Sequence, residues 1–270
     1  DRFHMKPQAD IDIAVIRLPH ISNFTDFNIW ENIDGVSLRY VTRSYDLGSP
    51  DMIILPGTKN TMADLRWLRE SGMEAAILRC HSTRQYGSSK GRPGCVIWGI
   101  CGGYQMLGQQ IIDEAGVEEQ SGVLRGIGLI PMTTYFHEEK SRRQVEGRIG
   151  QIPGIFAALS GLPLTGYEIH MGQTVYCNGD GSGAESNRSA FCANDATRNT
   201  EITQAVIADS TGRIYGSYIH GLFDKGEIAG RMIQTLAREK GISLEDGVWE
   251  DYRIIKERQY DKLADTLREY

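Results

Sequence analysis

The chain has 270 residues and a formal net charge of −6, from 29 basic and 35 acidic residues. Its 40% hydrophobic and 24% charged residues are ordinary for a globular protein that buries a sizeable core without disulfide or metal staples. No run is long and apolar enough to span a membrane, the first residues hold no export signal, and the acidic balance argues against a nucleic-acid-binding surface.

The first 116 residues alternate expected strands with expected helices. Short apolar or alternating runs predict strands at 11–18, 36–41, 51–57 and 94–100, and helical spacing predicts helices at 60–72 and 102–116. Asn60 or Thr61 is the expected cap of the first helix, and Gly72 its end. This order predicts an α/β fold with a doubly wound, mostly parallel sheet and flanking helices. Because ligands bind at the carboxyl ends of such strands, LPGT and GICGG are expected along one edge.

The second half is more β-like, with strand character around 147–150, 168–177, 201–209 and 213–221. The last two segments are joined by DSTGR, which predicts a hairpin turn. The stretch 178–200 is rich in Gly, Ser and Asn and is expected to be a surface loop. From 227 to 270 the pattern is polar and helical. We interpret this tail as a solvated helix face, and the alternative is a docking surface for another domain.

Cys101 is the one cysteine of five with a distinctive setting. The run Gly99-Ile100-Cys101-Gly102-Gly103 has the form G-x-C-x-G between an expected strand and an expected helix, which is typical of a nucleophile elbow. The glycines relieve crowding in a sharp turn, the helix N-terminus favours the thiolate, and the N–H of Gly102 faces a developing oxyanion. The alternative is a small, buried and inert cysteine. No CxxC pair occurs among the five, so we expect reduced thiols and a cytoplasmic protein.

A cysteine nucleophile requires a base, and two of the six histidines are candidates. His220 ends the expected strand RIYGSYIH at the sheet edge where an activating imidazole is needed. His170, in GYEIHMG, is the rival. Glu168 alternates with His170 on one strand, so the two share a face, either at the mouth of a site or as satisfied polar groups.

The set Pro56-Gly57, GICGGYQ and YIHG resembles the class I, or triad-type, glutamine amidotransferases. The resemblance implies a flavodoxin-like fold in which Cys101 attacks the carboxamide of glutamine and His220 is the base. It also implies that Gly57 and Gly102 line the oxyanion hole and that Gln105, in the C-x-G-x-Q pattern, binds substrate. No residue is assigned to a metal.

The chain departs from that family after the histidine, where His220-Gly221-Leu222 lacks the usual glutamate. Asp224 or Glu168 could replace it, but we favour a Cys–His dyad without an orienting carboxylate. The loss is typical of one branch, the cobyric acid and cobyrinic acid amide synthases. The segments IRLPHISNFTDF, LPGTKNT, GYEIHMG and YIHGLFD resemble the cobyric acid synthases from about residue 12 to about residue 224. The role of IRLPHISNFTDF is not deducible, and a packed strand-to-helix connection is preferred.

This second resemblance implies the remaining expectations. Residues 1–270 form a single amidotransferase domain, with a core at about 10–225, a helical tail at 226–270, and an N-terminal ATP-dependent synthetase domain that is absent. No P-loop occurs in the chain, so ATP and Mg²⁺ are expected in that other domain, and no cofactor in this one. Ammonia from glutamine would amidate the b, d, e and g carboxylates of adenosylcobyrinic acid a,c-diamide in cobalamin biosynthesis. The expected partners are glutamine and the corrinoid acceptor, with no nucleic acid or membrane.

Other functions remain open from the sequence. A related amidotransferase with another acceptor has the same motifs. A γ-glutamyl hydrolase or cysteine peptidase uses the same kind of elbow, since one fold serves several hydrolases. A non-enzymatic relative would keep the cysteine for packing alone. Gln105 and IRLPHISNFTDF favour the amidotransferase.

Overall fold

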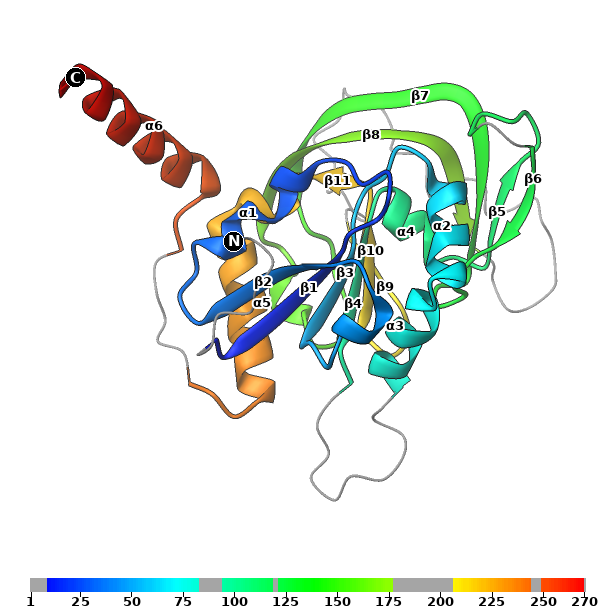
Figure 1. The fold of residues 1–270 in the computed structure, drawn as a ribbon, viewed down its shortest axis with the longest axis horizontal. Coiled ribbons are helices and arrows are strands. Elements are labelled where there is room, and N and C mark those ends of the chain that lie inside the picture. The colour runs from blue at the N-terminus through cyan, green and yellow to red at the C-terminus, as the bar shows by residue number, and fades with distance from the viewer. Residues whose placement is uncertain (1–8, 83–93, 119–120, 177–205, 244–248, 270) are drawn as a thin grey trace.

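The computed structural model describes residues 9–82, 94–118, 121–176, 206–243 and 249–269, and its strands form two sheets (Figure 1). The first sheet has six strands, in the spatial order β2 (Val36–Val41), β1 (Ile11–Ile16), β3 (Met52–Leu55), β4 (Val96–Ile100), β10 (Ile214–Ser217) and β9 (Ile207–Ala208). The second has five, in the order β11 (Ile219–His220), β8 (Pro163–Tyr176), β7 (Met132–Arg148), β5 (Gln110–Asp113) and β6 (Gly122–Arg125).

The first sheet is parallel except at its edge, where β9 pairs antiparallel with β10. This confirms the predicted mostly parallel sheet and the hairpin across DSTGR. The buried strands β3 and β4 are continuous apolar runs, as strands covered on both faces require. They lie side by side, with Leu55 opposite Gly99, so LPGT and GICGG end at the same edge.

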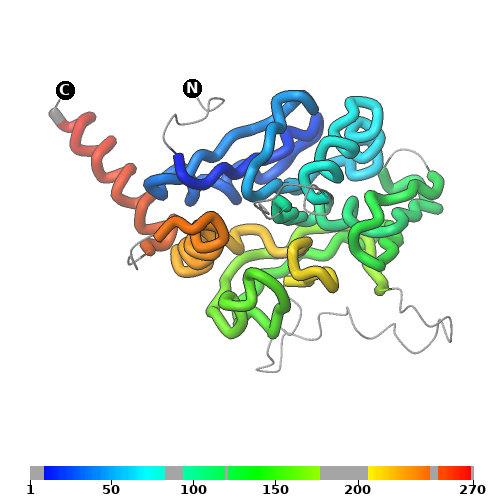
Figure 2. Tube along the Cα trace, turned by 90° about the horizontal axis from the view of Figure 1, so that it is seen from below, coloured from blue at the N-terminus to red at the C-terminus, as the bar shows by residue number. Residues whose placement is uncertain are grey.

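Helices cover both faces of the first sheet. On one face α2 (Thr61–Glu70), α3 (Met73–Ser82) and α4 (Gly102–Met106) pack over alternate strand residues such as Ile53 and Ile97. On the other face α1 (Asn28–Glu31) and α5 (Gly226–Glu239) pack over their neighbours, among them Ile54 and Trp98. Because side chains alternate along each strand, they contribute to two separate cores, one on each face of the sheet. Figure 2 shows the same layers from below.

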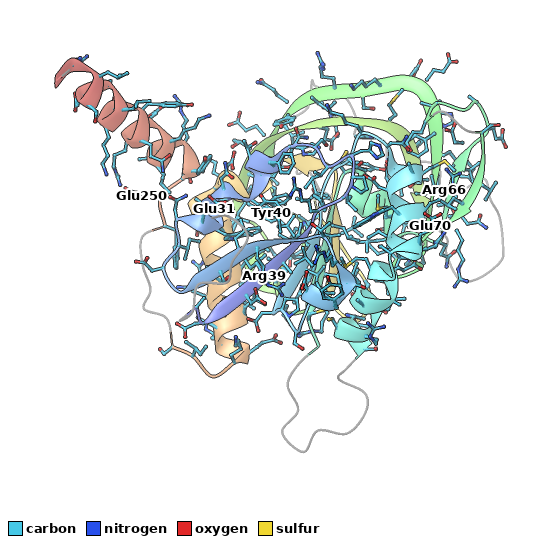
Figure 3. The ribbon with its side chains drawn as sticks, viewed as in Figure 1. Glu31, Arg39, Tyr40, Arg66, Glu70 and Glu250 are labelled. Atoms are coloured by element: carbon cyan, nitrogen blue, oxygen red, sulfur yellow. The ribbon has the colours of Figure 1, made fainter. Side chains whose placement is uncertain are left out.

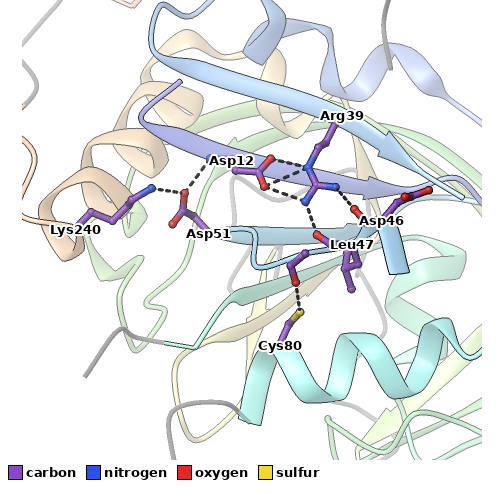
Figure 4. Close-up of polar contacts among 8 residues, drawn as sticks. Asp12, Arg39, Asp46, Leu47, Asp51, Cys80 and Lys240 are labelled. Atoms are coloured by element: carbon purple, nitrogen blue, oxygen red, sulfur yellow. Dashed lines mark hydrogen bonds and ion pairs between the residues drawn. The ribbon is translucent and has the colours of Figure 1, made fainter. Parts of the chain in front are cut away.

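Charged side chains tie the amino ends of the first strands together (Figure 4). The buried guanidinium of Arg39 on β2 donates to Asp12 on β1 at 2.8 Å and to the carbonyl of Asp46 at 2.7 Å. Lys240, just after α5, pairs with Asp51 at 2.9 Å. These contacts therefore join β2 to β1 and the end of α5 to the residue that precedes β3.

The predicted helix at 102–116 is wrong beyond its first turn. α4 ends at Met106, and the chain then runs as strand β5. The amide of Gln109 donates to Met132 at 2.7 Å, and its carbonyl accepts from Gly126 at 2.8 Å. Pairing with segments further along the chain therefore overrides the local helical pattern, and the adjacent isoleucines Ile111 and Ile112 suit a strand.

The second sheet arches over the carboxyl edge of the first, with β7 and β8 as long paired ribbons (Figure 1). β8 contains most of the expected strand 168–177, and β7 ends in the expected 147–150. The chain crosses between the sheets in one step: β10 ends at Ser217, Tyr218 follows, and β11 begins at Ile219. This crossing puts the end of RIYGSYIH in the second sheet, against β8.

In the described ranges, short 3-10 helices lie in the connections: η1 (Phe24–Phe27), η2 (Ser44–Asp46), η3 (Ala157–Leu159) and η4 (Leu222–Asp224). The expected cap of α2 is confirmed, since Asn60 accepts from the amide of Ala63 at 3.0 Å. α3 was not predicted from the sequence. The expected loop at 178–200 lies outside the described residues.

The described part of the tail is helical as predicted, and its helices α5 and α6 differ in burial. α5 buries Ile228, Met232, Ile233 and Leu236 at helical spacing, so it belongs to the core rather than to a solvated tail. α6 (Tyr252–Glu269) projects from the body (Figure 1). None of the helices in the described ranges has the length and apolar character that crossing a bilayer requires.

Candidate active site

Cys101 lies at the sharp turn between β4 and α4. Its backbone has φ 51° and ψ −111°, outside the conformations that residues with a Cβ prefer. The turn is possible because its neighbours are glycines: a Cβ on Gly103 would lie 2.0 Å from the carbonyl oxygen of Leu55, and one on Gly99 2.7 Å from Tyr104 Cα. The geometry is that of the predicted nucleophile elbow.

The Cys101 thiol is held between the two sheets. Its backbone N–H donates to the carbonyl of Ser217 on β10 at 2.8 Å, and its Sγ donates to the carbonyl of Ile169 on β8 at 3.5 Å. The residue is 7% exposed. Cys80, Cys95 and Cys101 are free thiols, whereas Cys177 and Cys192 lie outside the described residues.

The turn after β3 closes on this elbow, as the shared sheet edge predicts. A Cβ on Gly57 would lie 2.9 Å from His220 Cε1 and 3.7 Å from Cys101 Cβ. A Cβ on Gly102 would lie 2.6 Å from Cγ2 of Thr58. Gly57 is therefore adjacent to both predicted catalytic side chains, and only a residue without a side chain fits there. The backbone N–H groups of Gly57 and Gly102 have no protein acceptor among the described residues.

His220 faces the same point from the second sheet. It ends β11, opposite Tyr167 on β8, and the two rings stack with centroids 5.3 Å apart. The side chain is buried, at 1% exposure. Burial lowers the pKa of His220, but hydrogen bonds with Asp26 and with Cys101 outweigh it and raise the pKa to about 10. The site therefore favours an imidazolium beside the cysteine.

A carboxylate orients His220, and the expectation of an unassisted dyad is wrong. Asp26, in η1, accepts from Nδ1 of His220 at 2.7 Å, and its second oxygen accepts from the amide of Gly221 at 3.1 Å. Asp26 is 3% exposed. A hydrogen bond at Nδ1 leaves Nε2, which lies 3.2 Å from Nδ2 of Asn23, as the ring nitrogen for proton transfer.

Asp26 comes from IRLPHISNFTDF, the segment interpreted as simple packing. In the same segment Asn23 adopts a left-handed backbone with φ 55°, and its Nδ2 lies 3.0 Å from Nδ1 of His220. An antiparallel bridge between Ile21 and Thr58 fastens the segment to the turn after β3. In the sequence, Asp26 is marked only by its position among aromatic residues, and this does not indicate which side chain it contacts.

Neither alternative carboxylate contacts the imidazole. Glu168 instead accepts from Nε of Arg143 at 2.6 Å. Asp224 is half-buried, and its Oδ1 has no partner within the described residues. Burial, and then the charge of Asp26, raise the pKa of Asp224 to about 7.

His170, the rival base, is engaged elsewhere. Its ring stacks on Tyr218 with centroids 3.8 Å apart, and its Nδ1 lies 3.2 Å from the carbonyl of Gly172. Burial lowers the pKa of His170, although the charge of Glu168 opposes this. His220, whose pKa is raised by Cys101, is therefore the histidine coupled to the thiol.

Gln105 lies one helical turn after Cys101 and is 2% exposed. Its Nε2 donates to the carbonyl of Met171 on β8 at 2.9 Å and to the Tyr218 hydroxyl at 3.3 Å, while its Oε1 accepts from Thr61 at 3.3 Å. The side chain thus joins the elbow to the second sheet, and the expected contact with substrate stays a prediction. In the described part of the chain no group of three or more His, Cys, Asp or Glu side chains is placed to hold a metal ion.

The arrangement has known counterparts. Residues 12–228 match the family described as the CobB/CobQ-like glutamine amidotransferase domain. A protein of Lachnoclostridium phytofermentans named cobyric acid synthase is 45% identical over 271 residues, covering 99% of this chain and 50% of that protein. Another of that name, from Ruminiclostridium cellulolyticum, is 44% identical over 271 residues, covering 100% of this chain and 49% of that protein. The chain spans about half the length of the relatives it matches.

Solved structures share the fold. PurLQS from Thermotoga maritima superposes with a TM-score of 0.55 over 84% of this chain and 98% of that chain, at 16% identity. At this identity the likeness concerns the architecture alone, which is the mostly parallel α/β sheet with its flanking helices.

Proposed function

The chain belongs to the CobB/CobQ-like glutamine amidotransferase family, and we propose that it is the glutaminase half of a cobyric acid synthase. The observation that carries the proposal is the strained Cys101 at a strand-to-helix elbow, coupled to a buried His220 that Asp26 orients. This constellation is the one that nucleophilic attack on an amide carbonyl requires.

In the first half-reaction, Cys101 Sγ attacks the carboxamide carbon of glutamine. The carbonyl oxygen becomes an oxyanion, which the N–H groups of Gly57 and Gly102 stabilise. One such donor typically lowers the barrier by about 3 kcal/mol. His220 gives its proton to the departing nitrogen, the carbon–nitrogen bond breaks, and ammonia and a glutamyl thioester on Cys101 result.

In the second half-reaction, His220 takes a proton from water, and the hydroxide attacks the thioester carbon. The carbon–sulfur bond breaks, glutamate leaves, and the thiolate–imidazolium pair is restored. Asp26 holds the imidazole in one tautomer and stabilises its positive charge in both halves. Gln105 is proposed to position glutamine, which requires a change in the contacts that it makes with Met171 and Tyr218.

The molecule that accepts the ammonia is proposed from the names of the relatives rather than from the geometry of the site. Because the matching cobyric acid synthases are about twice as long as this chain, we assign amide formation to the half without a counterpart here. That half would use ATP and Mg²⁺ to activate the b, d, e and g carboxylates of adenosylcobyrinic acid a,c-diamide. Residues 1–270 then form one amidotransferase unit that supplies ammonia.

Replacing the nucleophile tests the proposal. In the complete synthase, Cys101→Ala is expected to abolish glutamine-dependent amidation and to leave amidation by added ammonia intact. Glutamate release and corrinoid mass are the two measurements, and Cys80→Ala is the matched control. Continued glutamate release by the Cys101 variant would falsify the assignment.

A further inference from the structure

α6 has an apolar stripe that the rest of the described chain leaves exposed. Tyr260, Leu263 and Leu267 recur at positions i, i+3 and i+7, so they line one helix face. Their exposures are 59%, 57% and 69%. Large apolar side chains gathered on one face of a projecting helix mark a contact surface more often than scattered ones do.

The base of α6 is anchored, so its direction is defined. Tyr252 and Ile255 pack against the core, and the Tyr252 hydroxyl accepts from Asn28 at 3.0 Å. Arg258 donates at 2.6 Å to Glu250. Glu250, labelled in Figure 3, precedes the helix. Beyond this base the helix extends away from both sheets (Figures 1 and 2).

The comparisons indicate what covers the stripe. The amidotransferase family match ends at residue 228, before α6. The cobyric acid synthase relatives, in contrast, match 99% and 100% of the chain, with α6 included. α6 is therefore shared with cobyric acid synthases but lies outside the matched CobB/CobQ-like glutamine amidotransferase domain. A partner specific to those synthases is their other half.

We propose that the stripe of Tyr260, Leu263 and Leu267 docks into an apolar groove on the half of the synthase that has no counterpart in this chain. The inference rests on the proposed function. The base of α6 contacts Asn28, two residues after Asp26, so the docked helix joins that half to the segment that orients His220. An acceptor half held this way is fixed relative to the glutaminase site.

The test compares hydrogen exchange of the 252–269 amides in the isolated 270-residue chain and in the complete synthase that contains this sequence. Exchange is expected to be at least about tenfold slower in the complete synthase, because docking protects the helix. The double variant Leu263→Gln, Leu267→Gln should remove that extra protection and reduce glutamine-dependent amidation while ammonia-dependent amidation remains. Glutamine is a good helix former, so α6 itself is expected to persist.

The matched control is the double variant Lys262→Gln, Asp265→Gln, which lies on the opposite helix face. Like the leucine variant, it leaves the net charge unchanged. Its hydrogen exchange and its amidation should equal those of wild type. Equal exchange in the isolated chain and the complete synthase overturns docking. Docking is also overturned if the isolated chain shows protection that increases with its concentration and is lost in the double leucine variant. That result would assign the stripe to contact with a second copy of the chain. Exchange needs no catalysis, so failure here is distinct from failure of Cys101→Ala.

Discussion

Asp26 and His220 are 194 positions apart in the chain, yet Asp26 Oδ2 lies 2.7 Å from His220 Nδ1. Both side chains are almost fully buried, and Asp26 also binds the next amide, that of Gly221. The carboxylate therefore fixes both the ring and the backbone that carries it. Asp26 thus makes the contact that the resemblance to triad-type amidotransferases assigned to a glutamate two residues after the histidine.

Asp26→Asn is expected to lower kcat for glutamine hydrolysis by about 10²- to 10⁴-fold, because the amide does not stabilise an imidazolium and favours the wrong tautomer. Steady-state glutamate release is the measurement. Asp224→Asn is the control, since a carboxyl whose pKa is raised to about 7 is already partly neutral near pH 7. Its activity should stay within about threefold of wild type. Near wild-type activity in Asp26→Asn would show that another group orients His220.

His220 should make the stability of the fold depend on pH. Its folded-state pKa is raised to about 10, above the unfolded value of about 6.5. A raised pKa contributes stability that is complete below the unfolded value and is lost as pH rises through the folded value. The free energy of unfolding of wild type, relative to His220→Asn, should therefore fall between about pH 6.5 and pH 10.

Urea denaturation at steps of pH measures this difference, with both proteins in the same buffers. A difference that stays level across that range would mean that His220 is neutral in the folded chain.

Gly103→Ala is expected to destabilise the fold by about 3 kcal/mol or more, because the added methyl would lie 2.0 Å from the Leu55 carbonyl oxygen. The displaced elbow should also lose most glutaminase activity. Gly161→Ala is the control: its φ is 80°, but nothing lies within 4 Å of the added methyl, so only backbone strain of about 1 kcal/mol applies. Equal unfolding free energies for the two variants would argue against crowding at the elbow.

The elbow was predictable because its determinants are neighbours in sequence. A buried apolar run, a cysteine and flanking glycines specify β4, the turn and the start of α4 without reference to any other segment. The approach of Gly57 to Cys101 was also predictable, since parallel strands end at one edge. These inferences needed only periodicity and the rule for ligand sites in doubly wound sheets.

The errors lie where distant segments decide the outcome. Residues after Met106 carry a helical pattern, but backbone bonds from Gln109 to Met132 and Gly126 convert them to a strand. Asp26 carries no local sign of its partner, because a loop closure of 194 residues brings His220 to it. The carboxylates that the sequence offered were Asp224, shortly after the histidine, and Glu168, on the strand of the rival base, whereas Asp26 lies near His220 only in the folded chain.

Tyr218 is the single residue between β10 and β11, and this shortness has a mechanical consequence. Ser217, on one side of it, binds the amide of Cys101, and His220 follows three positions later in the other sheet. A connection of one residue is too short to accommodate a rotation of the long β7–β8 ribbon relative to the central sheet. Such a rotation would change the distance between the Cys101 thiol and the His220 imidazole. The geometry of the site therefore depends on the angle between the two sheets.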